Sequence, residues 1–83
     1  MAWRLSVTAD QDVENIAAYG ASMFGIRQAK KYHDGLKRSF EFLSEHPLAV
    51  RARAEFLPPV RIHSFGVHVI LYVIDAEGVL VTC

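Results

Sequence analysis

The sequence predicts a single α+β domain in the order β-α-α-β-β-β, with an antiparallel sheet covered on one face by an αα-hairpin. The first half holds two stretches of helical periodicity separated by Gly25, and the second half holds three β-rich stretches joined by short turns. Strands joined by short turns are antiparallel neighbours, and the apolar stripes of two helices need an apolar sheet face. At 83 residues the chain has room for one core.

The N-terminal residues predict a strand followed by a helix. Trp3, Leu5 and Val7 alternate with polar residues, which is the period of a strand with one buried face. Thr8 and Gln11 have the spacing of a capping box, so we expect a helix to begin near Ala9. Apolar residues then recur at helical spacing until Gly25 ends the helix: Val13, Ile16, Ala17, Gly20 and Phe24.

A second, longer helix follows Gly25 directly. Its apolar stripe consists of Ile26, Ala29, Tyr32, Leu36, Phe40 and Leu43, and Pro47 ends it near Glu45 or His46. Gly20 and Gly35 lie inside the two predicted helices, where each costs about 1 kcal/mol relative to alanine. We therefore expect this glycine pair to let the two helices approach each other closely.

The segment from Leu48 to Pro59 is expected to be irregular, and β-structure follows it. The predicted strands are Val60 to Phe65, His68 to Asp75 and Val79 to Thr82, with turns at Gly66–Val67 and Ala76–Glu77–Gly78. The middle strand is apolar on both faces, so a partner is expected to cover the face that the helices leave open. The sequence is thus predicted to be one domain, 1–83, whose last strand is truncated at Cys83.

Composition and charge exclude several classes of function. Nine Lys/Arg residues balance nine Asp/Glu residues, whereas general nucleic-acid binding needs surplus positive charge, so no direct specific DNA binding is expected. The longest apolar run is far shorter than the ~20 residues of a membrane span, and no signal peptide is evident, which predicts a cytoplasmic location. The single cysteine and four scattered histidines lack metal-ligand spacing, so neither a metal nor a cofactor is expected.

Basic residues gather in the second half of the chain. Between Val50 and Ile70 there are three arginines and two histidines against one acid: Arg51, Arg53, Arg61, His63 and His68. Arg61 and His63 share one face of their strand, where arginine could stabilise a pentavalent phosphate and histidine could act as acid or base. The same pattern also fits a solvated sheet edge or a partner-binding surface.

The element order and several local sequences resemble the ParE toxins of the RelE/ParE superfamily. The resemblance is carried by Trp3-Arg4-Leu5-Ser6, Ile16-Ala17-Ala18-Tyr19, His46-Pro47 and the run from Gly66 to Ile74. It covers essentially the whole chain and depends on the order and spacing of these sequences rather than on one decisive motif.

The resemblance implies a RelE/ParE-like fold and the toxin of a bacterial type II toxin–antitoxin system. Such a toxin inhibits DNA gyrase by protein–protein contact, without catalysis, and forms a hetero-oligomer with a ribbon-helix-helix, ParD-like antitoxin. No catalytic residue is expected on this interpretation. The candidates for contact with antitoxin or target are Arg51, Arg53, Arg61, His63, His68, Ile70, Tyr72 and Ile74.

Two alternatives remain at this point. The chain could be a RelE-like ribosome-dependent mRNA endonuclease that uses Arg61 and His63. It could also be a truncated, inactive toxin that only binds its antitoxin, because family members continue past the position of Cys83.

Overall fold

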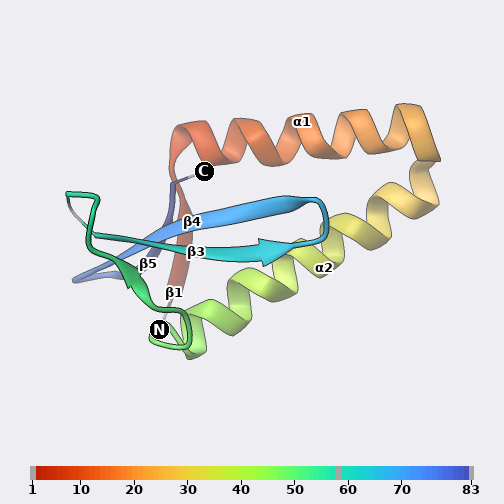
Figure 1. The fold of residues 1–83 in the computed structure, drawn as a ribbon. Coiled ribbons are helices and arrows are strands. Elements are labelled where there is room, and N and C mark those ends of the chain that lie inside the picture. Colours follow the sequence, from red (N-terminus) through yellow and green to blue (C-terminus); the bar gives the residue numbers. More distant parts are fainter. Residues whose placement is uncertain (1, 58, 83) are drawn as a thin grey trace.

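A computed structural model describes residues 2–57 and 59–82 of the chain. The elements are β1 (Ala2–Leu5), α1 (Val7–Phe24), α2 (Ile26–Glu45), β2 (Ala52–Arg53), β3 (Val60–Phe65), β4 (His68–Asp75) and β5 (Gly78–Val81) (Figure 1). Two helices pack against one sheet, so the predicted α+β class is confirmed. The predicted end of the last strand at Cys83 lies outside the described residues.

The sheet has five strands in the order β1-β5-β4-β3-β2. The β3–β4 and β4–β5 pairs are antiparallel as predicted, and β2 adds a third antiparallel pair with β3. In contrast, β1 pairs with β5 in parallel, from Ala2 opposite Gly78 to Leu5 opposite Val81. The sheet is therefore mixed rather than entirely antiparallel. The hairpins that precede β5 fix its direction, and β1 adds to its free edge in the same direction.

Three details of the predicted elements were wrong, of which the last strand is one, since it spans Gly78–Val81 rather than Val79 to Thr82. The helix begins at Val7 rather than near Ala9, because Ser6 caps it: the Ala9 amide donates to Ser6 Oγ at 3.1 Å. Val7 therefore belongs to α1 and is 90% exposed instead of lining the strand's buried face. The segment expected to be irregular contains the short strand β2, in which Ala52 pairs with Arg61 of β3.

The helical hairpin turns at Gly25, as predicted, with a backbone φ of 90°. A Cβ on Gly20 would lie 3.3 Å from the Ala29 Cβ, so Gly20 does permit close approach of the helices. Gly35 serves a different contact, because a Cβ there would lie 2.8 Å from Cζ of Phe65 in β3. The second helix ends at Glu45, two residues before Pro47, as expected.

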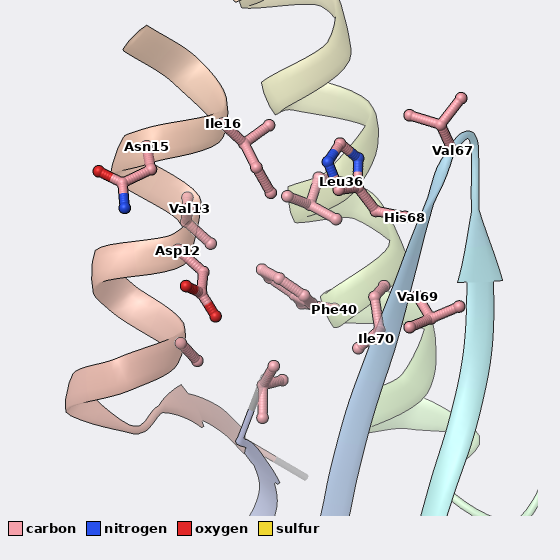
Figure 2. A pocket seen from close by; sticks show the side chains of 12 residues that line it. Asp12, Val13, Asn15, Ile16, Leu36, Phe40, Val67, His68, Val69 and Ile70 are labelled. Atoms are coloured by element: carbon pink, nitrogen blue, oxygen red, sulfur yellow. The ribbon is translucent and has the colours of Figure 1, made fainter. Parts of the chain in front are cut away.

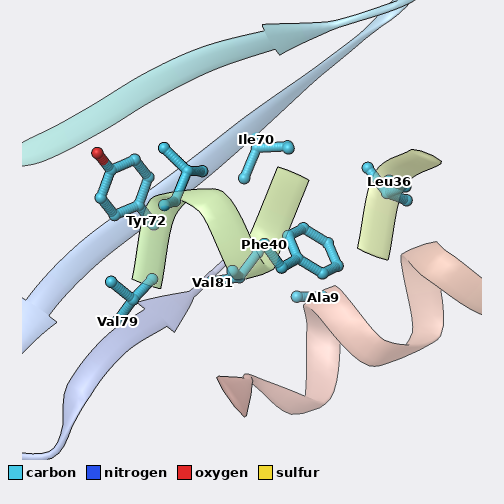
Figure 3. Packing of buried hydrophobic residues seen from close by; sticks show 8 residues of the cluster. Ala9, Leu36, Phe40, Ile70, Tyr72, Val79 and Val81 are labelled. Carbon is cyan, nitrogen blue, oxygen red and sulfur yellow. The ribbon is translucent and has the colours of Figure 1, made fainter. Parts of the chain in front are cut away.

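The core lies between α2 and one face of the sheet. Leu43 and Tyr72 are fully buried, and the ring of Trp3 packs on that of Phe40 at 5.1 Å. Figure 3 shows the cluster, in which α2, β4, β5 and the first turn of α1 all take part: Ala9, Leu36, Phe40, Leu43, Ile70, Tyr72, Val79 and Val81. The two ends of the predicted stripes, Phe24 and Ile26, are exposed because the hairpin tip extends beyond the sheet (Figure 1).

The opposite face of the sheet remains partly open to solvent. Side chains alternate along β4, so Val69, Leu71 and Val73 lie on the face away from the core residues Ile70 and Tyr72. Val69 is 52% exposed. This agrees with the expectation that the helical hairpin covers only one side of the sheet.

Candidate functional site

A concave feature lies between α1 and β4. The first helix packs mainly along α2 and diverges from the sheet, which opens a cavity of about 420 Å³. Figure 2 shows Val13 and Ile16 of α1 on one side, Ile70 of β4 on the other, and Leu36 and Phe40 of α2 between them.

A second cavity of about 490 Å³ adjoins the first toward the tip of the helical hairpin. Both cavities are lined by Ile16, Val67 and His68, so they form a continuous depression that we call the α1–β4 groove. The second cavity adds aromatic and small residues of both helices: Ala17, Tyr19, Gly20, Phe24, Ala29 and Tyr32. Its apolar lining and its length along a helix are typical of a surface that binds a segment of another protein.

A hydrogen-bonded pair of side chains lies at the boundary between the two cavities. The hydroxyl of Tyr32 on α2 is 2.6 Å from Nδ1 of His68, and it donates to the carbonyl oxygen of Phe65 at 3.2 Å. A Cβ on Gly66 would come within 2.7 Å of the same hydroxyl, so glycine is required for the approach. Tyr32 thus fastens the β3–β4 turn to α2 and holds the His68 ring beside the groove.

The two walls contributed by helices differ in charge. The first helix carries three carboxylates and no lysine or arginine, and Asp12 lines the groove. The second helix exposes a mixed but basic face that includes Arg27, Lys30 and Lys31. Asp12 lines the groove, whereas Asp10 and Glu14 are exposed and are not among its lining residues.

Most residues proposed from the sequence lie outside this groove. Arg51 and Arg53 are exposed, and Arg53 Nε donates to Glu55 Oε1 at 2.9 Å, which lowers the pKa of the Glu55 carboxyl. Ile74 is partly buried at the edge of the core. Of the eight candidates, His68 and Ile70 line the groove.

Arg61 and His63 share one face of β3, as predicted, and that face is turned toward the core. They stand opposite Tyr72 and Ile70 of β4 in the strand register. Both are half-buried, and the Arg61 guanidinium donates to the carbonyl oxygen of Val50. Arg61 is thus engaged in a structural contact.

Tyr72 has a structural contact of its own. Its side chain is fully buried, and its hydroxyl donates to the Pro47 carbonyl oxygen at 2.9 Å, which ties the end of α2 to the sheet. Burial raises the pKa of the Tyr72 hydroxyl, and the positive charge of Arg61 opposes that rise.

The groove wall formed by α1 was missed as a site from the sequence. Val13 and Ile16 were assigned to the helix–sheet core, since their spacing is that of an ordinary amphipathic helix. One signal was present in the sequence: all charged residues of α1 are acidic and lie in its first half. That pattern also fits the helix dipole, so it does not by itself identify a binding surface.

The described residues contain neither a metal-binding cluster nor a helix that could span a membrane. In residues 2–57 and 59–82, no three His, Cys, Asp or Glu side chains are grouped so that they could hold a metal ion. Neither described helix combines the length and the apolar character that a bilayer crossing needs.

The chain was compared with known proteins. The family described as the ParE toxin of the type II toxin–antitoxin system parDE matches residues 3–82, nearly the entire chain. A search of curated proteins found no match.

Proposed function

Because the chain belongs to the ParE toxin family, we propose that it inhibits DNA gyrase by protein–protein contact and that a ParD-like antitoxin neutralises it. The chain is the toxin of a type II toxin–antitoxin system, a class defined by an antitoxin partner. The proposal rests mainly on the family match over residues 3–82. The fold, in which two helices pack on a five-stranded sheet, is consistent with it.

The α1–β4 groove is the proposed docking site of the antitoxin. Its two cavities are lined mainly by apolar side chains that no other described segment covers. Ile16 and Val67 border both cavities, and Val67 is 91% exposed. A protein segment seated there would remove this apolar surface from water, at roughly 25 cal/mol per Å².

The placement of Arg61 and His63 supports binding rather than catalysis. A nuclease would need these groups free to meet a phosphate and a ribose hydroxyl. Here Arg61 Nη1 donates to the Val50 carbonyl oxygen, and both side chains are turned toward the core side of the sheet. The RelE-like endonuclease is therefore the less favoured alternative.

The proposal is tested by expressing the chain in bacterial cells that carry a DNA-damage reporter. A gyrase inhibitor that traps cleaved DNA is expected to arrest growth and switch on the reporter, and co-expression of a ParD-like antitoxin is expected to reverse both effects. Growth arrest with new mRNA 3′ ends and a silent reporter would instead identify the endonuclease. A chain that co-purifies with its antitoxin but leaves growth unchanged would identify an inactive toxin.

A further inference from the structure

A shallow depression of about 380 Å³ lies between the two helices, on a different side of the hairpin from the α1–β4 groove. It is lined by Ala17, Ala21, Ile26, Ala29, Lys30 and His33. Ala21, Ile26 and Lys30 line neither cavity of the groove. The hairpin therefore presents a second surface that is separate from the proposed antitoxin site.

This second surface continues along α1 toward the sheet. Asp10 and Glu14 precede Ala17 and Ala21 at spacings of four and three residues, so all four lie on one side of the helix. We use the name outer hairpin face for this side of α1 together with the exposed residues at the ends of the hairpin: Val7, Ile26, Arg27 and Lys30.

Negative and positive charge are separated along the outer hairpin face. The first half of α1 holds Asp10 and Glu14, and no charged residue follows Glu14 in this helix. The second helix begins with basic residues, among them Arg27 and Lys30, and has no acid before Asp34. The acidic end thus lies near the sheet and the basic end lies near the hairpin tip, which projects beyond the sheet (Figure 1).

The charged side chains of this face have no ionic partner in the described part of the chain. Four of them are exposed to solvent: Asp10, Glu14, Arg27 and Lys30. None of these four takes part in a salt bridge within residues 2–57 and 59–82. Their charges remain available to a partner molecule.

The packing of the helices fixes how far along the hairpin each base lies. A Cβ on Gly20 would be 3.3 Å from the Ala29 Cβ, so these two residues lie side by side. Since the helices run in opposite directions with the same rise per residue, Lys30 is level with the residue before Gly20. Arg27 is level with the position two residues after Gly20.

These levels make the face complementary to itself. The midpoint between the levels of Glu14 and Lys30 lies within about one residue of Ala17, and so does the midpoint between Asp10 and Arg27. A two-fold axis at Ala17 would therefore bring both acids of one copy opposite both bases of a second copy. In such a symmetric contact every pair of residues occurs twice.

The same symmetry also accounts for two exposed apolar side chains at the ends of the face. Val7 is 90% exposed and Ile26 is 79% exposed. The axis at Ala17 brings Ile26 of one copy toward Val7 of the other, where both would be partly removed from water. Small side chains lie near the axis, so the helices of the two copies can approach each other there.

We propose that the chain associates with a second copy of itself through the outer hairpin face, in an antiparallel contact with two-fold symmetry about Ala17. Glu14 of each copy pairs with Lys30 of the other. A second copy is the occupant that the charges favour, because any other partner would have to supply both signs of charge in this order, whereas the chain itself supplies them. The inference goes beyond the proposed function and does not depend on the gyrase target.

Self-association is measured by sedimentation velocity on the purified, folded chain at about 5 to 500 μM and about 50 mM NaCl. The expected result is a reversible monomer–dimer equilibrium that weakens when NaCl is raised to about 500 mM, since exposed ion pairs are screened by salt. A chain that stays monomeric over the whole concentration range at low salt would overturn the proposal.

Charge reversal tests the symmetric pairing. Glu14→Lys and Lys30→Glu each place like charges opposite each other twice, so either variant alone should dimerise about 10-fold more weakly or worse. An equimolar mixture of the two variants should dimerise again, because both contacts of the mixed dimer join opposite charges. Unchanged dimerisation of the single variants, or a mixture that stays monomeric, would overturn the proposal.

A matched mixture controls for the overall charge of the variants. Glu45→Lys changes the net charge as Glu14→Lys does, but it lies at the far end of α2, outside the outer hairpin face. Mixed with Lys30→Glu, it should form clearly less mixed dimer than Glu14→Lys does. Equal amounts of mixed dimer would show that net charge alone drives the association, and would overturn the assignment of Glu14 to the contact.

The apolar ends of the face are tested separately. Ile26→Ser should weaken dimerisation about 3-fold or more, because Ile26 occurs twice in the symmetric contact. Val67→Ser is the control, since Val67 is 91% exposed but lines the α1–β4 groove. Circular dichroism confirms that each variant is folded. A dimer that is weakened by Val67→Ser and not by Ile26→Ser would place the contact in the groove and overturn the proposal.

Discussion

Gly78 lies opposite Ala2 at the start of the parallel β1–β5 pairing, so closely that a Cβ on Gly78 would overlap the carbonyl oxygen of Ala2. Gly78 is buried and has a positive φ of 121°. Glycine is therefore needed at this position for two reasons, the backbone conformation and the contact with β1. The N-terminal strand, which leads into the groove-forming helix α1, depends on this approach.

Gly78→Ala is expected to destabilise the fold by more than about 2 kcal/mol, since it combines backbone strain with a clash against backbone atoms. Gly25→Ala is the matched control, because Gly25 also has a positive φ but has open space around its Cβ position. Gly25→Ala should lower the free energy of unfolding only through backbone strain, by roughly 1–3 kcal/mol. This loss should be smaller than that caused by Gly78→Ala. Urea unfolding measures both, and equal losses would show that the contact with β1 is unimportant.

Ser6→Ala should lower the free energy of unfolding by about 1 kcal/mol, because it removes the oxygen that accepts from the Ala9 amide. Thr8→Ala, two residues further along in α1, should change the free energy of unfolding by less than about 0.5 kcal/mol. Ser6→Asp should restore most of the loss, since aspartate is a comparable cap. A larger loss for Thr8→Ala would mean that the capping box suggested by the sequence forms after all.

Arg61→Met should destabilise the chain by roughly 1–3 kcal/mol, because it leaves the part-buried Val50 carbonyl without its donor. Arg51→Met, at an exposed position, should stay within about 0.5 kcal/mol. Thermal unfolding of the two variants measures the difference. Unchanged stability of Arg61→Met together with loss of toxicity would instead indicate a direct role in activity.

Stability should decrease on acidification partly through Asp75. The hydrogen bond from Arg4 holds the pKa of the Asp75 carboxyl below its ordinary value, and the Glu77 amide adds to this effect. The ionised form therefore stabilises the fold above the unfolded-state value of about 3.9, and this contribution is lost as the pH falls through the folded-state value.

The Asp75→Asn variant should consequently show a shallower loss of stability between about pH 5 and pH 2 than the unaltered chain. Added salt should reduce the difference between the two, since Arg4 and Asp75 are both partly exposed. Asp34→Asn, on the exposed face of α2, is the control. Identical acid-unfolding curves for Asp75→Asn and the unaltered chain would contradict the assignment.

Much of the fold could be predicted from the sequence because its signals are local. The α2 stripe, the stop at Pro47 and the two hairpin turns of β3–β5 each depend on neighbouring residues, and all appear where expected. The parallel partner of β1 could not be predicted, since it joins residues more than seventy positions apart. The strand β2 is two residues long and exists only by pairing with β3, so it has no pattern of its own.

The candidate site was predicted less well, for a geometric reason. The sequence showed that Val13 and Ile16 lie on an apolar helix face, but not that α1 diverges from β4 and leaves them lining a groove. Sequence spacing placed Arg61 and His63 on one face of β3, but not that this face is turned toward the core. His68 was identified among the basic residues, while its contact with Tyr32 is visible only in three dimensions.

The proposed inhibition of gyrase is tested by incubating the purified, folded chain with DNA gyrase and supercoiled plasmid. If the chain inhibits gyrase, double-stranded cleaved DNA should accumulate at a saturating concentration of the chain, and it should disappear when a ParD-like antitoxin is added first. The proposed target would be contradicted if gyrase kept its normal supercoiling activity at a saturating concentration of the chain and no cleaved DNA formed.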